Sequence, residues 1–437
     1  MLSAFGRALR TPDLRRKLLF TLGIIAIFRL GAFIPSPGVS YQNVQQCLQA
    51  GSTNQGVYQL INLFSGGALL QVSVFALGIM PYITASIIVQ LLRVVIPRFQ
   101  QLYDEGQSGQ SKLTQYTRYL TIALGLLNAT TLVSLARSGQ LLGTQCPAPI
   151  IPSDSIITTI LIVITLTAGT GLIMWMGELV TEKGVGNGMS ILIFTSIAAG
   201  FPTSLGQIWT TKGPGTFFTV LVIGLVVMGL VVFVEQSQRR VPVQYAKRMI
   251  GRRTVGGTST YIPIKVNMAG VVPVIFASSM LYLPSLIAQF NTPHDGSPAP
   301  DWVNWITTNL TRGDHPIYMI IYFLLIVFFT YFYVAITFNP EEVSDNMKKY
   351  GGFIPGIRAG RPTADYLQYV LSRITLPGAI YLGFVALIPL VALVLINANQ
   401  QFPFGGTSLL IMVGVGLETV KQIDAQLQQR HYEGLLR

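Results

Sequence analysis

The chain has 437 residues, of which 51% are hydrophobic and only 11% are charged, whereas roughly a quarter are charged in an average soluble domain. Long uncharged apolar runs recur along the whole chain, which excludes a string of soluble domains and indicates one polytopic membrane domain. A net charge of +12 would suggest nucleic-acid binding in a soluble protein. In a membrane protein it must first be tested against the distribution of Lys and Arg between loops.

Ten membrane-spanning helices are predicted from uncharged runs of roughly 17 or more residues, which gives an all-α fold. Basic residues (Arg7, Arg10, Arg15, Arg16 and Lys17) precede the first run, which ends at Ile34-Pro-Ser-Pro-Gly38 instead of a small-residue cleavage site. A retained span is therefore favoured over a signal peptide. We expect the spans near residues 18–35, 72–92, 119–136, 156–177, 187–201, 216–234, 270–290, 317–338, 375–396 and 404–418.

The second predicted span is interrupted and follows a short apolar piece. That piece, Leu60–Leu70, breaks at Ser65-Gly66-Gly67, and the span itself contains Gly78 and Pro81. Backbone groups freed by such breaks cannot face lipid, so the segment must be buried in protein or line a watery cavity. We therefore predict a plug followed by one wall of a pore.

Basic residues predict the orientation of the spans. With a cytoplasmic N-terminus, 25 of the 29 Lys and Arg residues fall in cytoplasmic segments. Only Arg137, Lys212 and Arg312 fall outside, and Arg29 alone lies within a span. This asymmetry fits ten spans with both termini in the cytoplasm.

The two halves of the chain resemble each other in pattern. Gly78-Ile-Met-Pro81 lies in the second span and Gly270-Val-Val-Pro273 in the seventh, and the fifth and tenth spans are both short. Paired interruptions at matching places indicate an inverted repeat with the working site at its interface. We predict halves of five spans each, about residues 1–202 and 203–437.

Residues suited to catalysis or metal binding are scarce. His294, His315 and His431 are scattered, and neither a nucleotide loop nor a Ser/His/Asp set is present. We therefore predict no enzyme activity, no cofactor and no metal site. Cys47 and Cys146 both fall in predicted outside segments, where a disulfide is one of two open alternatives.

Three further features have two interpretations each. Arg29 fits snorkelling or capping of carbonyls better than substrate binding. Gly184-Val-Gly-Asn-Gly188 fits a tight turn entering the fifth span better than a phosphate loop. Ile79 and Ile83 stand one helical turn apart, as do Ile193 and Ile197, and spacing alone favours ordinary lipid-facing or packing side chains.

Two predicted cytoplasmic loops, about residues 236–268 and 339–373, are strongly basic. The segment from Arg239 to Lys265 holds 7 basic residues and no acidic one, more than orientation requires. The second loop carries Lys348, Lys349, Arg358 and Arg361. We expect these loops to bind a phosphate-rich or acidic partner.

Motifs along the whole chain resemble those of the SecY family of protein-conducting channels, in the same order. They are Phe28-Arg-Leu-Gly-Ala-Phe-Ile-Pro35, Leu63-Phe-Ser-Gly-Gly67, Phe75-Ala-Leu-Gly-Ile-Met-Pro-Tyr-Ile83, Gln115-Tyr-Thr-Arg118, Gly184-Val-Gly-Asn-Gly188, Tyr245-Ala-Lys-Arg248, Gly251-Arg-Arg253, Lys265-Val-Asn-Met-Ala-Gly270, Gly352-Phe-Ile-Pro-Gly-Ile-Arg358 and Gly405-Gly-Thr-Ser408.

The resemblance implies an hourglass pore in a bacterial plasma membrane. It implies a pore ring of Ile79, Ile83, Ile193, Ile197, Ile275 and Ile411, which reverses the interpretation from spacing. It also implies a plug around Leu60, Phe64, Ser65, Gly66 and Gly67. A lateral gate would lie between spans 2 and 3 on one side and spans 7 and 8 on the other.

The implied function is passage of unfolded secretory polypeptides and sideways release of apolar segments into lipid. Arg252, Arg253 and Arg358 match loop tips that meet the ribosome or the SecA motor ATPase in the family. SecE and SecG subunits, signal peptides, unfolded preproteins and membrane lipids are the other implied partners. The outside loops 138–153 and 291–314 match no motif.

Two other functions fit part of the pattern. A secondary transporter also has inverted repeats and broken helices, but it needs coupling groups at the midplane, where carboxylates are scarce here. A structural scaffold would not need paired helix breaks.

Overall fold

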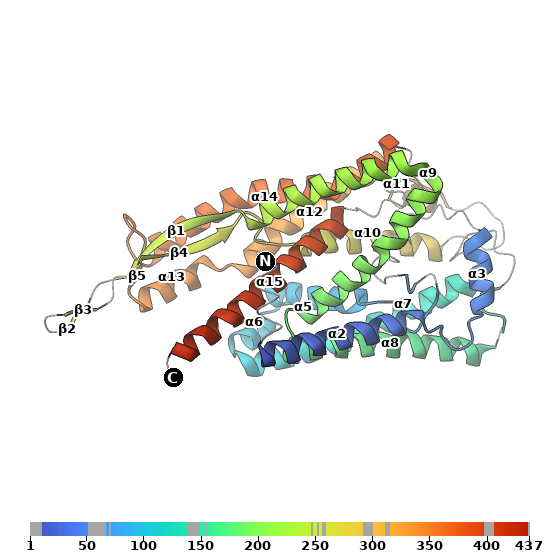
Figure 1. The fold of residues 1–437 in the computed structure, drawn as a ribbon, viewed down its shortest axis with the longest axis horizontal. Helices are drawn as coiled ribbons and strands as arrows, with labels where there is room; N and C mark the ends of the chain where they lie inside the picture. Colours follow the sequence, from blue (N-terminus) through green and yellow to red (C-terminus); the bar gives the residue numbers. More distant parts are fainter. Residues whose placement is uncertain are drawn as a thin grey trace.

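A computed structural model gives the arrangement of the chain (Figure 1). It describes residues 11–50, 67–69, 71–137, 149–153, 155–245, 248–250, 253–255, 259–291, 300–310, 315–396 and 406–435. The fold is mostly helical. Its helices are α2 (Pro12–Phe33), α3 (Tyr41–Ala50), α5 (Met80–Val95), α6 (Pro97–Asp104), α7 (Gln107–Arg137), α8 (Ile156–Lys183), α9 (Gly188–Gln236), α10 (Val272–Phe290), α11 (Asp301–Asn309), α12 (Pro316–Thr337), α13 (Pro340–Lys349), α14 (Arg361–Ile396) and α15 (Gly406–Leu435).

Each of the ten predicted spans overlaps one of these helices. The fifth and sixth spans both lie in α9, which is broken at Gly213, a residue with a positive φ of 82°. Among the described residues, five helices are long and apolar enough to cross a membrane, and six if the bent pair α5 and α6 is one span. The long apolar helices leave many large side chains exposed, such as Phe218 on α9 and Phe328 on α12, as lipid contact requires.

The second predicted span differs from the expectation in one respect. Residues 71–79 form turns, and the helix begins only at Met80, so α5 has 16 residues. Gly78 has a positive φ of 58°, which ends the turns, and Pro81 occupies the first helical turn, where its missing N–H costs nothing. Gly270, with a φ of 61°, precedes α10 in the same way, so the two halves share this backbone feature.

The turns before α5 are held by backbone pairing with the chain that follows α2. Ser36 donates its N–H to the carbonyl of Val72 at 3.1 Å, and Val74 donates to Ile34 at 2.9 Å. Val72 is fully buried and has a positive φ of 46°, an unfavourable value for a β-branched residue. Because packing on all sides fixes this strained residue, the segment that precedes α5 has a defined position.

A small antiparallel sheet joins the two basic loops, which the all-helical prediction did not include. Its strands are β1 (Gln238–Tyr245), β4 (Ser259–Lys265) and β5 (Gly352–Phe353), in the order β4-β1-β5. Val241 and Val243 alternate with exposed residues along β1 and pack on a cluster that includes Met347 and Leu367. The short strands β2 (Arg248–Ile250) and β3 (Arg253–Val255) form a separate hairpin.

The helices pack in two groups that meet along a seam. In the first group α7 packs against α5 and α8, and α2 lies on α8; in the second, α12 packs against α10 and α14 (Figure 1). Between the groups, α15 packs extensively on α9, whereas α5 meets α10 only lightly. We call the boundary between α5 and the pair α10 and α12 the seam.

Close packing of α8 against the turns before α5 depends on Gly169. A Cβ atom at this position would overlap the backbone carbonyl of Val74, whereas a Cβ at Gly171, two residues further along α8, would meet nothing within 4 Å. Gly169→Ala should therefore lower the stability of the folded protein by about 1–3 kcal/mol through overpacking.

Thermal unfolding of the purified protein in detergent measures this effect. The matched control, Gly171→Ala, should keep or slightly raise the midpoint, because alanine is a better helix former by roughly 0.5–1 kcal/mol. Equal midpoints for the two variants would contradict the close approach at Gly169.

Candidate functional site

Six isoleucines from both halves gather where the two groups of helices meet. Five are buried in one cluster, and Ile83 is partly buried and packs against it. They come from the residues around the start of α5, from α9, from α10 and from α15. Their burial contradicts the lipid-facing interpretation that spacing alone allowed. The five buried members are Ile79, Ile193, Ile197, Ile275 and Ile411.

The positions of these side chains follow from how each helix begins. Ile83 and Ile275 both stand two residues after the proline of the first helical turn. Ile193 and Ile411 both stand five residues after the glycine that opens their helix, Gly188 in α9 and Gly406 in α15. Asn187 caps α9, since its side-chain oxygen accepts from the N–H of Met189 at 3.1 Å. This cap confirms the predicted turn into the fifth span.

A short repeat that was not predicted from the sequence brings the cluster together. Gly188-Met-Ser-Ile-Leu-Ile193 and Gly406-Thr-Ser-Leu-Leu-Ile411 share Gly, Ser, Leu and Ile at matching places. Ile197 and Val415 stand one helical turn further on in the two helices, and both are buried in the isoleucine cluster. The shared residues are few, but they are a signal in the sequence that pairs Ile193 with Ile411.

A cavity of about 430 Å³ opens on the isoleucine cluster. Ile83, Ile193, Ile275 and Ile411 line its apolar part, and helices of both groups form its walls. The rest of its lining is mixed, and the apolar and aromatic residues there are Tyr82, Ile87, Met189, Val271, Val272, Tyr333 and Val415. The polar lining residues are Ser86, Gln90, Thr114, Arg118, Glu178, Thr181, Glu182, Asn187 and Ser190. The site is thus a cavity with a mixed polar and apolar lining, which reaches four of the six isoleucines.

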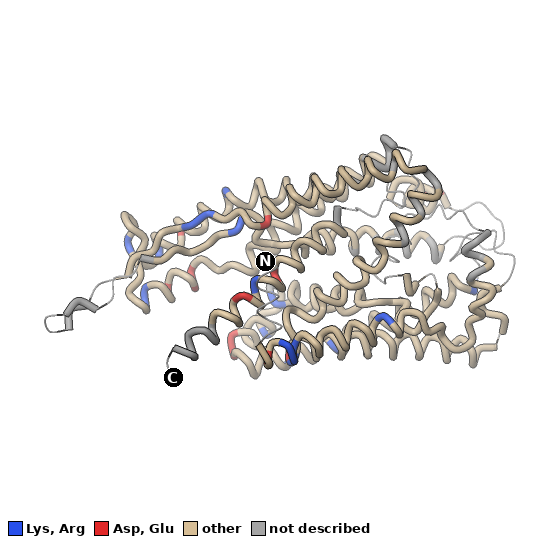
Figure 2. The backbone as a smooth tube through the Cα atoms, in the orientation of Figure 1, with Lys and Arg blue, Asp and Glu red and all other residues tan. Residues whose placement is uncertain are grey.

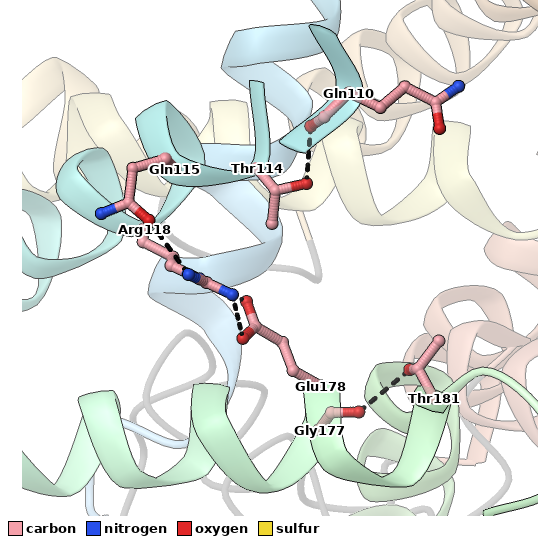
Figure 3. A network of polar contacts seen from close by, with 7 residues as sticks. All are labelled: Gln110, Thr114, Gln115, Arg118, Gly177, Glu178 and Thr181. Carbon is pink, nitrogen blue, oxygen red and sulfur yellow. Dashed lines mark hydrogen bonds and ion pairs between the residues drawn. The ribbon is translucent and has the colours of Figure 1, made fainter. Parts of the chain in front are cut away.

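An ion pair fixes one side of this cavity. Nε and Nη2 of Arg118 donate to the two carboxylate oxygens of Glu178 at 2.9 and 2.8 Å, and Nη1 donates to the side-chain oxygen of Gln115 at 3.0 Å. Figure 3 shows the two charged side chains pointing toward each other from α7 and α8. Paired hydrogen bonds of this kind are strong and directional, so they hold the two helices in register. This pairing was not predicted from the sequence.

Hydroxyl groups around the ion pair are satisfied within their own helices. Thr181 donates to the carbonyl of Gly177 at 2.9 Å, and Thr114 donates to the carbonyl of Gln110 at 3.0 Å (Figure 3). Oγ1 of Thr181 also accepts from the N–H of Gly188 at 2.9 Å, so this hydroxyl joins α8 to the start of α9. Within the described parts of the chain, no group of three or more His, Cys, Asp or Glu residues could hold a metal ion.

Charge is concentrated at one end of the molecule. Figure 2 shows most charged residues around β1, β4 and α13 and at the neighbouring ends of α2, α6, α7 and α8, whereas the opposite part is almost free of them. Arg358 is exposed on the loop between β5 and α14. Two hydrogen bonds hold that loop, from Thr363 Oγ1 to the Arg358 carbonyl at 2.8 Å and from Ser344 Oγ to the Gly360 carbonyl at 2.6 Å. The loop that carries Arg358 is thus held in place by hydrogen bonds.

Several predicted site residues cannot be compared with the structure. Leu60, Phe64, Ser65, Gly66 and Arg252 lie outside the described residues, as does Cys146. Gly67 is described, has a positive φ of 91° and stands at the start of a buried turn. For Arg253 only the backbone is described, in β3. Arg29 stacks over the ring of Phe33, with its guanidinium carbon 5.2 Å from the ring centroid.

The fold and the site define a helical membrane protein in which apolar side chains from both halves gather in one buried cluster. The family model described as SecY matches residues 73–420. Protein translocase subunit SecY from Streptomyces galbus and that from Micrococcus luteus are each 65% identical, and the one from Mycobacterium tuberculosis is 60% identical; each alignment covers all of both chains. The chain therefore belongs to the SecY family.

Solved structures share the fold at low sequence identity. A protein-conducting channel superimposes with a TM-score of 0.63 at 18% identity, covering 93% of this chain and 91% of the other. Sec61 in the canine ribosome-channel complex from the endoplasmic reticulum gives 0.60 at 16% identity over the same shares. Membership of the SecY family makes the chain a channel subunit rather than an enzyme.

The ion pair between Arg118 and Glu178 should show energetic coupling. Removing Arg118 leaves the Glu178 carboxylate, whose side chain is only 18% exposed, without its partner. Arg118→Ala and Glu178→Ala should each destabilise the protein, and the double variant should lose less than the sum. A coupling free energy of about 1–2 kcal/mol is expected for a partly exposed bidentate pair.

A double-mutant cycle of unfolding free energies in detergent measures the coupling. Ser111→Ala on α7, which removes only an exposed hydroxyl bonded within its own helix, is the control and should leave stability almost unchanged. Additive effects of the two charge removals would contradict the pairing.

Proposed function

We propose that the chain forms a protein-conducting channel that passes unfolded secretory polypeptides across the bacterial plasma membrane and releases apolar segments sideways into lipid. The observation that carries this proposal is the isoleucine cluster, which is built from both halves and lines part of a cavity between them. In this function Ile79, Ile83, Ile193, Ile197, Ile275 and Ile411 act as the pore ring.

The pore ring seals by two properties of branched apolar side chains. A narrow passage lined only by such groups excludes water, so ions find no hydration inside it. When a polypeptide enters, the same side chains close around it by dispersion contacts that require no particular hydrogen-bond partner. The channel therefore accepts chains of unrelated sequence and remains tight while they pass.

Sideways release takes place through the seam. The light contact between α5 and α10 supports this, because the halves are joined far more strongly through α9 and α15. Separation of α5 from α10 and α12 exposes the pore interior to lipid. A segment in the pore then partitions by its own hydrophobicity, at about 0.8 kcal/mol per buried CH₂ group.

The plug of this channel is the segment about 60–70, with Leu60, Phe64, Ser65, Gly66 and Gly67. One solved relative, with a TM-score of 0.61, is a SecY protein whose plug domain stabilises the closed state and maintains a membrane seal. Ala68 and Leu69, the buried residues of the described turn at 67–69, support the same role here.

Both termini and the basic loops face the cytoplasm, where an energy-supplying partner binds. The concentration of charge at one end of the molecule supports this orientation (Figure 2). Arg252, Arg253 and Arg358 make contact with a ribosome or with the SecA motor ATPase, and the ribosome-bound Sec61 relative supports the ribosome as a partner. SecE and SecG are the further subunits of the assembly.

Export of unfolded chains by reconstituted vesicles tests the function. Vesicles that contain the full chain with its partner subunits and SecA should export two unfolded preproteins of unrelated mature sequence at comparable rates, because the ring recognises no side chain. Export that requires one particular substrate, or that needs an ion gradient instead of the motor, would favour a transporter and contradict the proposal.

Charge reversal at Arg358 tests the partner surface. Arg358→Glu should reduce ATP-driven export at least severalfold, because the new carboxylate on this ordered loop repels an acidic partner. The amount of channel in the membrane should stay the same. Lys112→Glu, an exposed basic residue on α7 outside the basic loops, is the control. Normal export by Arg358→Glu would show that this loop does not bind the partner.

A further inference from the structure

Arg93 connects three helices at the seam. It lies in the last turn of α5, and its Nη2 donates to the carbonyl oxygen of Ile336 on α12 at 3.4 Å. Its guanidinium carbon lies 3.8 Å from the centroid of the Tyr103 ring on α6. Its Nε is buried and has no hydrogen-bond partner among the described residues. One side chain thus touches the helices on both sides of the boundary.

The contact with α12 is favourable because of where α12 ends. Ile336 is the last residue but one of α12, whose final carbonyls have no partner within the helix. These carbonyls carry the negative end of the helix dipole, which attracts a cation. Arg93 therefore stabilises the end of a helix that belongs to the other half of the protein.

Tyr103 holds the guanidinium in the position that this contact needs. A planar guanidinium stacks on an aromatic ring, and the attraction is stronger where water is partly excluded. The chain bends by 99° between α5 and α6, which brings Tyr103 back over Arg93. The ring acts on α12 only through the arginine.

The contact matters because little else crosses the seam at this point. α5 packs mainly on α7 and α6, and α12 packs mainly on α10, α14 and the short α11. Apolar packing also crosses the seam, as with Ile87 of α5, which packs in the same cluster as Phe276 and Phe329 of α10 and α12. Apolar contacts are not directional, whereas the hydrogen bond from Arg93 requires a narrow range of distance and angle. A small separation of the helices is therefore enough to break this bond.

We propose that Arg93 is a specificity-determining residue that latches the seam closed, and so sets how apolar a segment must be before it leaves the pore sideways. The proposal rests on the proposed function. Opening the seam breaks the bond from Arg93 to the Ile336 carbonyl, so that an entering segment must contribute enough lipid partitioning to offset this loss. Weakening the latch lowers the required hydrophobicity.

Distances between spin labels across the seam test the latch independently of transport. Labels are placed at exposed positions of α5 and α12, at Val95→Cys and Ala335→Cys, in the full chain with Cys47 and Cys146 replaced by serine. Arg93→Ala should raise the population of long distances about fivefold. Tyr103→Leu should cause a smaller rise in the same direction.

Insertion of test segments provides the second measurement. A series of segments with increasing leucine content is presented to vesicles that contain each variant. Arg93→Ala and Tyr103→Leu should insert segments that the unmodified channel exports, and the double variant should behave as Arg93→Ala because the ring acts through the arginine. Arg98→Ala, an exposed arginine on α6, is the matched control and should leave both the distances and the threshold unchanged.

The outcomes separate the latch from the function on which it rests. Unchanged distances and an unchanged threshold in Arg93→Ala would overturn the latch. If Arg93→Ala does not fold, the same result in Arg93→Lys and Tyr103→Leu would overturn it. Failure of the unmodified chain to export or insert any segment would instead overturn the proposed function, while the distance measurement would still test the latch.

Discussion

Contact between branched apolar side chains at the junction of the two halves is the interaction on which the structure depends. Five isoleucines are buried there, and a sixth packs on them. They lie at or near the starts of four helices, which begin at Met80, Gly188, Val272 and Gly406. Glycines with positive φ and prolines in the first turn make two of these starts possible. A helix that ran straight through would place the same side chains at different depths.

The halves are joined unequally around this junction, and the inequality determines how the protein can move. α9 and α15 pack closely and carry matching residues, so the halves are firmly joined on this side. On the other side α5 meets α10 lightly, and a polar link from Arg93 to the end of α12 spans the boundary. Within the first half, the ion pair between Arg118 and Glu178 links α7 to α8.

The sequence predicted the fold well where its signals were long. Each of the ten apolar runs falls on a helix, although the fifth and sixth share α9, and Gly78 and Gly270 indicated the matching breaks. Spacing could not decide between lipid and pore for Ile79 and Ile193, because a helical period shows which residues share a face but not what that face meets. The resemblance to a family was needed to group all six isoleucines.

Other features were not predicted from the sequence, because their patterns were short or depended on residues far apart in the chain. The alternation around Val241 and Val243 is typical of a strand, yet it lies in a basic loop and was not interpreted as one. Arg118 and Glu178 are 60 residues apart, so nothing local pairs them. Arg93 donates to a backbone carbonyl 243 residues away, and no pattern of side chains in the sequence predicts such a contact.

Ion conductance across a planar bilayer tests the apolar seal most directly. The unmodified channel at rest should conduct almost no ions, and replacing Ile79, Ile83 and Ile275 together with serine should produce a clear leak, because hydroxyl groups let water enter the constriction. The same replacement at three exposed isoleucines of α8, Ile157, Ile160 and Ile164, should not. An unchanged resting conductance in the pore variant would contradict the central claim that these side chains seal the channel.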